Sequence, residues 1–343
     1  MKKKQWIGIV VAGVVFIAVC ATGIFSNVVQ SKLTEKTKTT ENKTDMLKNI
    51  WSSSEEDITL PTEEFVGVLN IVGTIQASSS DNISLTGSDD GQYNHNLYMQ
   101  YIDELEKSKD NKAILLYVNS PGGTVYESDE LYLKLMEYKK KTKRPVYAYF
   151  ASQACSGAYY ISMAADEIYA NRNTWTGSIG VIVSLTNYKK LYDKLGIKEI
   201  DITSGKNKSM GSGGLDLTDE QYDILQSLVD EAYDQFSGIV SEGRGIDIAT
   251  VKKIADGRIY SAKQAKQKKL VDEIGTEDEL KTLIEKENKL SKDVVYDTAK
   301  SSKLDFFSSL MGSVQKIMPK SDSELAVDIV ENKGKGVLMY YAD

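Results

Sequence analysis

The chain is poor in histidine and cysteine. Its 343 residues include one histidine, His95, and two cysteines, Cys20 and Cys155. A Ser-His-Asp hydrolase needs a histidine whose tautomer and orientation are fixed by a carboxylate, whereas His95 lies in a polar stretch that we expect to be a solvated loop. Two cysteines so far apart indicate neither a disulfide framework nor a zinc site. We therefore expect no histidine-based triad, no metal and no other cofactor.

An excess of positive charge is also absent. The formal net charge is -7 at pH 7, and this acidic balance argues against a nucleic-acid partner. Hydrophobic residues make up 41% of the chain. That fraction is enough for a full core in one large domain or in two modest ones.

One long uncharged run lies near the N-terminus. Three lysines at positions 2–4 precede residues 6–25, which carry no charge. About 20 helical residues span the roughly 30 Å hydrocarbon core of a bilayer, and lysines on the short side keep that end in the cytoplasm. We therefore expect residues 1–25 to be a cytoplasmic stub and a transmembrane anchor, with the rest of the chain outside. A cleaved secretory signal is the alternative, and a lipoprotein attached through Cys20 is a weaker one.

Composition divides the rest of the chain into three parts. Residues 26–64 are rich in Lys, Thr, Glu, Asn and Ser without sustained apolar periodicity, which indicates a flexible stalk. Apolar runs and helical patterns alternate over residues 65–290, so we expect an α/β domain with a mainly parallel sheet flanked by helices. Residues 291–343 are expected to form a tail. The predicted strands are 65–75, 113–118, 145–150, 167–170, 180–185 and 198–202, and the predicted helices are 97–109, 125–140, 160–165, 218–240, 248–255, 262–268 and 277–286.

Two of these segments carry further information. The run 113–118 is continuously apolar, which is typical of a strand covered on both faces. The helix 218–240 begins with Thr218 and Gln221 at the spacing of a capping box. Its apolar residues recur at helical spacing, so we expect that stripe to pack in the core or against another subunit and not to bind a ligand.

Ser156 is the candidate nucleophile. It follows the apolar run 145–150 and precedes the helical run 160–165, so it falls where a strand turns into a helix. At such a turn a hydroxyl lies near backbone N–H groups that have no partner inside the helix. The small neighbours Ala154, Gly157 and Ala158 leave room for another peptide backbone. A serine that merely caps a helix is the competing interpretation.

Without a usable histidine, a lysine can activate the serine if its amine is neutral. A lysine with a pKa of about 10.4 is uncharged in only roughly one molecule in 2,500 at pH 7, so the site must lower that pKa by burial. The loop 203–209 closes an apolar run with glycine and small residues and contains Lys206 and Lys208. It could carry an amine into a cleft.

Several motifs occur together in the order that a known family has them. They are Asn119-Ser120-Pro121-Gly122-Gly123, Ala154 to Tyr160, Thr176-Gly177-Ser178-Ile179-Gly180-Val181, Ser204-Gly205-Lys206-Asn207-Lys208 and Gly257 to Ala265. Over residues 65–279 the chain closely resembles the signal peptide peptidase A group of peptidase family S49, which consists of Ser/Lys proteases. The resemblance is to the short, single-unit bacterial form. Each motif alone is a weak signal, but five in register over one domain are a strong one.

The resemblance implies a role for five residues. Ser156 matches the family nucleophile, and Lys208 matches the general base. Ser178 matches the hydroxyl that positions the lysine amine, while Gly123 and Gly157 match the backbone donors to the oxyanion. The resulting chemistry is peptide hydrolysis through an acyl-enzyme.

Two side chains compete with these assignments. Lys206 is close to Lys208 in the sequence, but the family pattern Ser-Gly-x-x-Lys selects Lys208. Cys155 stands where the family usually has a small residue, so its side chain could narrow the pocket, and its thiol is an alternative nucleophile.

The resemblance also implies a fold, an oligomeric state and a class of substrate. It implies a crotonase/Clp protease-like fold and a ring-like homo-oligomer, an octamer in the family, in which the serine and lysine of one site come from neighbouring subunits. The implied substrates are remnant signal peptides and other short or unfolded chains at the outer face of the cell membrane. Two alternatives remain open: an S49-type protease for a specific membrane protein, and a catalytically silent scaffold that binds peptides or acyl groups.

The C-terminal end suggests a self-interaction. Residues 337–342 are apolar and end near a small residue, much as a substrate does. They could therefore occupy the protein's own cleft, where they would restrain the enzyme or be trimmed by it. A disordered or locally packed tail is the alternative. Farther upstream, residues 304–318 would present an apolar stripe if helical, which suits packing on the domain or binding to a membrane surface.

Overall fold

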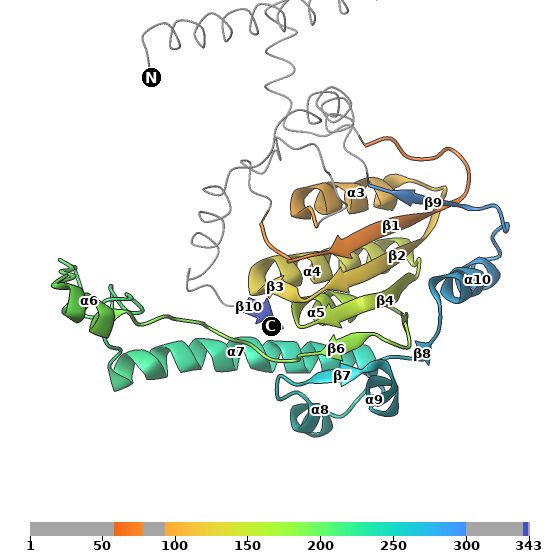
Figure 1. The fold of residues 1–343 in the computed structure, drawn as a ribbon. Helices are drawn as coiled ribbons and strands as arrows, with labels where there is room; N and C mark the ends of the chain where they lie inside the picture. Colours follow the sequence, from red (N-terminus) through yellow and green to blue (C-terminus); the bar gives the residue numbers. More distant parts are fainter. Residues whose placement is uncertain (1–57, 78–92, 300–338, 342–343) are drawn as a thin grey trace, which may run out of the picture. The chain divides into compact units, whose positions relative to one another are not determined.

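A mainly parallel sheet of eight strands carries the fold (Figure 1). The computed structural model describes residues 58–77, 93–299 and 339–341. The strand order is β7-β6-β4-β2-β1-β9, with β5 paired to both β4 and β8. All pairs in this sheet are parallel except β6 with β7, so the sheet is mixed. The bounds are β1 Phe65–Val72, β2 Asn111–Ser120, β4 Val146–Cys155, β5 Glu167–Ala170, β6 Trp175–Gly177, β7 Ile259–Ser261, β8 Glu273–Ile274 and β9 Val295–Thr298.

Helices connect and flank these strands. Three of them, α7, α9 and α10, begin with a complete capping box, and the box predicted from Thr218 and Gln221 is the one that starts α7. Each box satisfies backbone donors that the first turn leaves unpaired. The bounds are α3 His95–Lys107, α4 Val125–Thr142, α5 Gly157–Ser162, α6 Lys189–Leu195, α7 Asp219–Arg244, α8 Ile248–Ile254, α9 Ala262–Gln267 and α10 Glu277–Glu287.

The central strands are apolar on both faces. Ile114 and Leu116 of β2 belong to a large cluster with α3, α4 and α5, whereas Ala113 and Leu115 belong to a second cluster that Leu280 and Ile284 of α10 complete. Side chains alternate between the two faces of a strand, so burial on both faces requires the continuous apolar run that the sequence has. The prediction for 113–118 is confirmed, since its core residues 113–116 and 118 are fully buried.

The segment between β6 and α7 departs from the prediction. We call residues 181–217 the arm. It contains α6, but the predicted strands 180–185 and 198–202 do not form. Ile200 and Ile202 are 72% and 98% exposed. A strand requires a neighbouring strand to satisfy its backbone groups, and the described residues offer none to residues 198–202. The alternation of apolar and polar residues was therefore misleading here.

A second, two-stranded sheet joins distant parts of the chain. β3, Gly122–Thr124, pairs antiparallel with β10, Met339–Tyr341. Met339 stands opposite Thr124, Tyr340 opposite Gly123 and Tyr341 opposite Gly122. Part of the predicted C-terminal tail therefore lies along the Pro-Gly-Gly turn that the sequence singled out.

Several predictions concern residues outside the described ones. They are the anchor in residues 1–25, most of the stalk in residues 26–64 and the stripe in residues 304–318. In the part of the chain that the structure describes, no helix is both long enough and apolar enough to span a membrane. At the other end of the domain the main sheet takes in β9, so the folded core extends past residue 290.

Candidate active site

Ser156 joins a strand to a helix in a strained backbone conformation. β4 ends one residue before it and α5 begins one residue after it. Its φ of 54° and ψ of -120° lie in a region that residues with a side chain rarely adopt, at a cost of roughly 1–3 kcal/mol. Its N–H donates to the carbonyl of Gly177 at 2.8 Å, and its carbonyl accepts from the N–H of Tyr160 at 2.9 Å. A strained serine at a strand-to-helix turn is how other hydrolases present their nucleophile.

The hydroxyl of Ser156 is buried and unpaired. The residue is fully buried, and its Oγ has no hydrogen-bond partner among the residues that the structure describes. Nor does the side chain cap α5 by a hydrogen bond, so the helix-cap interpretation is not supported. Buried hydroxyls are nearly always bonded, and an exception calls for a specific explanation such as a catalytic role.

Ser178 lies beside Ser156 because β4 and β6 are parallel neighbours. Cys155 pairs with Gly177 in their ladder, so the residues that follow the two strands meet at one edge of the sheet. Gly177 and Ser178 both have positive φ, 87° and 48°. A Cβ on Gly177 would stand 2.7 Å from the ring of Tyr260, so only glycine fits there. Ser178 is 6% exposed.

Gly123 reaches the same edge from β2. The turn after β2 places Gly122 at φ 107°, and the N–H of Gly122 donates to the Ser120 hydroxyl at 3.1 Å. A Cβ on Gly123 would stand 1.8 Å from the carbonyl oxygen of Ile75, so the two backbones approach more closely than any side chain permits. β3 contacts α5, the helix that starts with Gly157.

The N–H of Gly123 faces the edge that β10 covers. On the other edge, the Ile75 N–H donates to the Gly122 carbonyl at 2.9 Å and the Thr124 N–H donates to the Ile75 carbonyl at 2.8 Å. Successive residues of a strand point their N–H and C=O groups to opposite edges, so both groups of Gly123 point away from Ile75. Tyr340 of β10 stands opposite Gly123 there, and β10 also contacts α5. An extended strand therefore lies where a peptide would meet the site.

Lys208 is not part of this cluster within one chain. It lies in a turn of the arm, with its N–H bonded to the Gly205 carbonyl at 3.1 Å, and it is exposed. Its amine does not reach the Ser156 hydroxyl, because that oxygen has no bonded partner in the described residues. The competing Lys206 forms an ion pair with Glu220 at 2.7 Å. The structure thus gathers four of the five predicted site residues and leaves Lys208 apart.

Cys155 does not have the environment of a nucleophile. Its side chain is 1% exposed, and its Sγ lies 3.6 Å from the carbonyl oxygen of Trp175. Burial raises the pKa of the Cys155 thiol to about 12. Since the thiolate is the reactive form, this cysteine is inert at neutral pH.

The prediction that His95 lies in a solvated loop was wrong. It is the first residue of α3 and is only 5% exposed. Its Nδ1 lies 2.6 Å from the Tyr93 hydroxyl and its Nε2 lies 2.7 Å from a Glu130 carboxylate oxygen. The polar neighbours in the sequence suggested a loop, whereas the carboxylate beside Nε2 belongs to a residue 35 positions away. Both ring nitrogens are occupied, and neither bonds the Ser156 hydroxyl.

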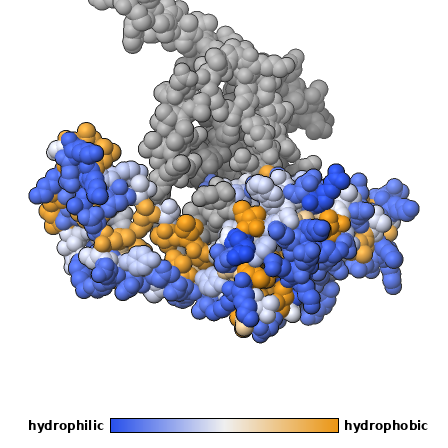
Figure 2. Space-filling view, turned by 60° about the horizontal axis from the view of Figure 1, so that its bottom comes forward, coloured by the Kyte–Doolittle hydropathy of each residue, from blue (hydrophilic) through white to orange (hydrophobic). Residues whose placement is uncertain are grey.

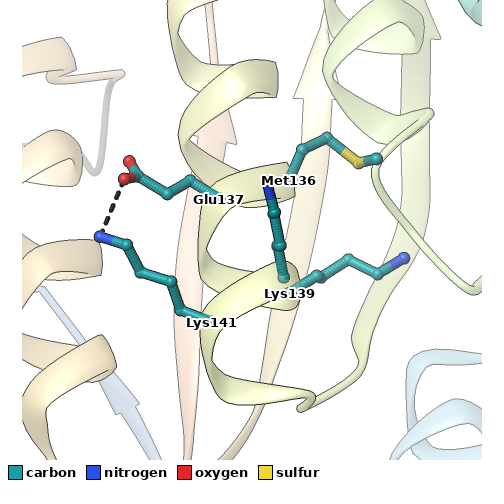
Figure 3. A pocket seen from close by; sticks show the side chains of 5 residues that line it. Met136, Glu137, Lys139 and Lys141 are labelled. Carbon is teal, nitrogen blue, oxygen red and sulfur yellow. Dashed lines mark ion pairs between the residues drawn. The ribbon is translucent and has the colours of Figure 1, made fainter.

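Two cavities differ in their relation to these residues. A cavity of about 480 Å³ opens beside Ser178 and is lined further by Gly180, Val181, Ile182, Val229, Asp230, Tyr233, Lys252, Ala255, Asp256 and Gly257. A larger one, about 790 Å³, is lined by residues of α4 only, from Met136 to Lys141 (Figure 3). There Lys141 pairs with Glu137 at 2.8 Å. It is a groove along one helix and contains no predicted site residue.

Two family models match parts of the chain. Residues 138–291 match the model of peptidase family S49, and residues 73–176 match that of Clp protease. The first match includes the strained Ser156 turn together with Ser178 and Lys208. Over residues 138–291 the chain is similar to a peptidase family S49 domain. The resemblance seen in the motifs and the expected Clp protease-like α/β fold are confirmed.

Relatives of the S49 domain come from distant organisms. The "Putative signal peptide peptidase SppA" of Enterococcus faecium is 41% identical over 222 residues, 65% of this chain and 64% of that one. "Protease 4" of Haemophilus influenzae is 34% identical over 214 residues, 62% of this chain and 33% of that one. "Serine protease SPPA, chloroplastic" of Arabidopsis thaliana is 32% identical over 180 residues, 52% of this chain and 26% of that one. The chain spans less than two thirds of the length of each.

Proposed function

We propose that the S49 domain is a serine endopeptidase in which Ser156 is the nucleophile and Lys208 the general base. The observation that carries this proposal is the unpaired, buried hydroxyl of Ser156 on a strained turn. This turn leads into α5, which contacts β3, a strand that already holds an extended segment at its free edge. Peptides bind to such edges by adding a strand, which aligns their backbone for attack.

The residues present suffice for acyl transfer. The Lys208 amine takes the proton from the Ser156 hydroxyl as Oγ attacks the peptide carbonyl carbon. The N–H groups of Gly123 and Gly157 stabilise the charge that develops on the carbonyl oxygen. The amine then protonates the leaving nitrogen, the C–N bond breaks, and a water activated by the same amine hydrolyses the acyl-enzyme. The Ser178 hydroxyl, beside Ser156, positions the amine.

The amine is supplied by a second copy of the chain in this proposal. Lys208 lies on the arm, which has its largest apolar side chains on the outside, and Figure 2 shows such apolar surface in orange, including on the arm at the left. Surfaces of this kind mark protein interfaces. A head-to-tail contact that places one arm on the next subunit closes into a ring, as the resemblance to octameric relatives implies. The exposed apolar residues are Ile182, Tyr188, Leu191, Leu195, Ile197, Ile200, Ile202 and Leu217 on the arm, with Tyr222 and Leu228 on α7.

Mixing two inactive variants tests the shared site. Ser156→Ala and Lys208→Ala are expected to have no peptidase activity alone. If they are unfolded together and refolded as an equal mixture, about one site in four combines an intact serine with an intact lysine from the next copy. Recovery of about a quarter of wild-type activity supports the proposal. No recovery beside active refolded wild type contradicts a shared site, and full activity of Lys208→Ala contradicts its role as base.

A second proposal concerns the tail: we infer that β10 restrains the enzyme by occupying the substrate edge of β3. Tyr340 stands opposite Gly123, the proposed oxyanion donor. A segment of the same chain competes at a high effective concentration, so removal of residues 337–343 is expected to lower the apparent KM and leave kcat unchanged. Tyr340→Pro, which removes the N–H facing Gly123, is expected to act likewise, whereas Tyr340→Phe keeps it. Equal KM values for all four proteins would contradict restraint by the tail.

The same tail could be trimmed by the enzyme. Mass spectrometry of the active protein beside Ser156→Ala is the test. A C-terminus shortened only in the active protein is expected if β10 also serves as a substrate, and identical C-termini would count against trimming.

The proposed substrates are remnant signal peptides and other short or unfolded chains at the outer face of the cell membrane. Strand addition to β3 requires an extended segment, which a folded protein does not offer. Placement at the membrane, with a cytoplasmic N-terminus, rests on the uncharged run 6–25. Cleavage of a synthetic signal peptide and of unfolded casein, with native proteins left intact, is the expected result.

The two alternatives have discriminating measurements. A fluorophosphonate probe labels an activated serine, so labelling of wild type but not of Ser156→Ala would exclude a silent peptide-binding scaffold. Quantitative comparison of membrane proteins in cells with and without the enzyme would reveal a single accumulating protein if the protease has one specific target. Accumulation of many short fragments instead is the result expected here.

A further inference from the structure

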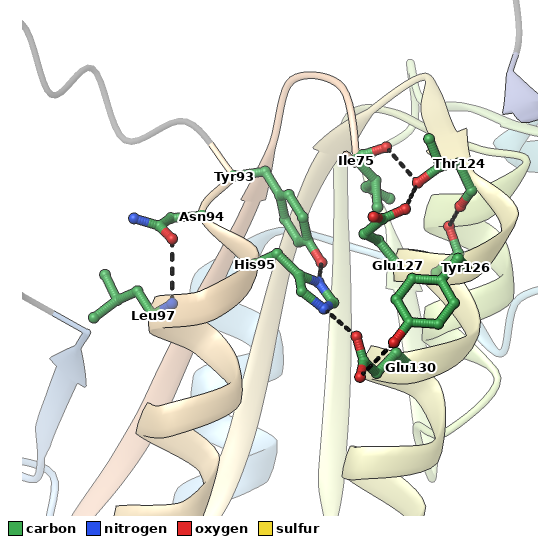
Figure 4. A network of polar contacts seen from close by, with 10 residues as sticks. Ile75, Tyr93, Asn94, His95, Leu97, Thr124, Tyr126, Glu127 and Glu130 are labelled. Atoms are coloured by element: carbon green, nitrogen blue, oxygen red, sulfur yellow. Dashed lines mark hydrogen bonds and ion pairs between the residues drawn. The ribbon is translucent and has the colours of Figure 1, made fainter. Parts of the chain in front are cut away.

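The one histidine of the chain lies at the end of the helix pair α3–α4 that is nearest to β3. Its Nε2 lies 2.7 Å from Glu130 on α4, and the other carboxylate oxygen of Glu130 accepts from the Tyr126 hydroxyl at 3.1 Å (Figure 4). An ionised carboxylate can only accept, so Nε2 donates to Glu130, while Nδ1 lies 2.6 Å from the Tyr93 hydroxyl. Burial, and then the charge of Glu127, raises the pKa of Tyr93, which keeps that hydroxyl protonated as a donor.

The start of α4 needs such support from outside. Thr124 occupies the N-cap position, but its side chain makes no capping hydrogen bond. Its hydroxyl instead contacts the carboxylate of Glu127, as Figure 4 shows. The first turn of α4 follows β3 without an intervening loop. Any shift of that turn therefore moves Thr124 and the adjacent Gly123.

His95 links this turn to the end of β1. The residue two positions before it, Tyr93, donates its backbone N–H to the Val72 carbonyl at 2.8 Å. Ile75, three residues beyond Val72, bonds both neighbours of Gly123. The position of β3 is thus fixed twice from the same strand end: directly by Ile75, and by way of His95 and α4.

Other ties between α3 and α4 lie farther from β3. Lys134 pairs with Asp103, and Lys141 pairs with Glu106 at 2.9 Å. They hold the same two helices together without reaching the first turns of α4. The chain therefore offers a matched comparison for the contact made by His95.

We propose that His95 is a positioning residue for the peptidase reaction: through Glu130 it fixes the first turns of α4 and so the N–H of Gly123. The inference rests on the proposed function, because Gly123 matters only if its N–H stabilises the oxyanion. Such a donor acts more strongly on the transition state than on the bound peptide. Its misplacement is expected to lower kcat about ten- to a hundredfold with little change in KM.

The experiment compares six variants of the full chain with the wild type. His95→Leu and Glu130→Ala are each expected to lose kcat by the same factor, and the double variant to lose no more than either, because both break one linkage. His95→Gln, which keeps a donor near Glu130, is expected to recover most of the activity. Lys134→Met, which breaks a tie remote from β3, is expected to keep kcat within about twofold, and Ser156→Ala defines the background.

The outcomes separate two failures. Wild-type kcat in both His95→Leu and Glu130→Ala, beside an inactive Ser156→Ala, would overturn the positioning role and leave the proposed function intact. An equal loss of kcat in Lys134→Met at an equal loss of Tm would also overturn it, because general loosening of the helix pair would then explain the effect. Should His95→Leu fail to fold, Glu130→Ala decides, since its side chain is 38% exposed. Hydrolysis that does not depend on Ser156 would overturn the proposed function and this inference with it.

Discussion

A single methyl group on Gly123 is expected to disable the site. The Cβ of Gly123→Ala would stand 1.8 Å from the Ile75 carbonyl oxygen, 2.6 Å from its carbonyl carbon and 2.7 Å from its nitrogen, where real contacts essentially never fall under 3.0 Å. All three are backbone atoms, so no side chain can turn aside. β3 and the Ile75 segment must separate by about 1.2 Å, the difference between 3.0 and 1.8 Å.

That displacement sets the size of the effect. A misplacement of about 1 Å can cost a factor of about 100 in rate, and removal of a whole oxyanion donor costs about 10²–10³. We therefore expect the kcat of Gly123→Ala to fall about 100-fold, equivalent to about 2.7 kcal/mol of transition-state stabilisation. Initial rates on an unfolded or synthetic peptide, at saturating concentration, measure it.

The control is Gly238→Ala inside α7. Apart from the helix's own backbone, no described atom lies within 4 Å of a Cβ placed there, and alanine is favoured over glycine inside a helix by up to about 1 kcal/mol. Its activity is expected to equal that of the wild type, with an equal or higher Tm. If Gly123→Ala kept wild-type kcat and Tm, the close approach of β3 to Ile75 would be irrelevant to catalysis and the reasoning above would be refuted.

Three further predictions concern stability. Burial raises the pKa of Cys155 from 9.0 to about 12; the folded state then holds a proton that the unfolded chain loses, so denaturant titrations should show wild-type stability falling between about pH 9 and 12, and Cys155→Ala should lose that part of the slope. Asp272→Asn weakens the bidentate ion pair with Arg244, whose side chain is 7% exposed, and should lower the free energy of unfolding by about 3 kcal/mol. Lys252→Met removes an exposed ion pair and should lower it by under about 1 kcal/mol. Equal losses of Tm in the two variants would contradict this. Ser156→Gly should relieve strain and raise the free energy of unfolding by about 1 kcal/mol while abolishing hydrolysis, and an unchanged Tm would argue against strain at the turn.

Local patterns predicted the elements that carry the site. The apolar run 113–118 and the helical pattern of 125–140 correspond to β2 and α4, with the Pro-Gly-Gly turn between them. Gly123 was assigned from the family resemblance, and the structure shows that no side chain fits there, because a Cβ would stand 1.8 Å from the Ile75 carbonyl oxygen. β6 and β7 were not predicted, since three residues each are too few to show a period.

Long-range partners could not be predicted in the same way. Nothing near His95 in the sequence predicts its contact with Glu130. A polar neighbourhood is equally compatible with a loop and with a buried network. The isoleucines of the arm alternate as they would in a strand, yet they are exposed in this chain. The motif that named Lys208 says nothing of where its amine lies, because the position of an exposed side chain depends on contacts that one chain does not contain.

The short strand β3 has a consequence for how the protein is kept soluble. An uncovered strand edge is a template on which any extended chain can pair, and proteins usually blunt such edges with proline, charge or a bulge. None of these devices is compatible with an edge that accepts a peptide backbone, as proposed for β3. If β10 restrains the enzyme as proposed, this strand solves both problems, since it shields the edge from aggregation and yields it again to a stronger competitor.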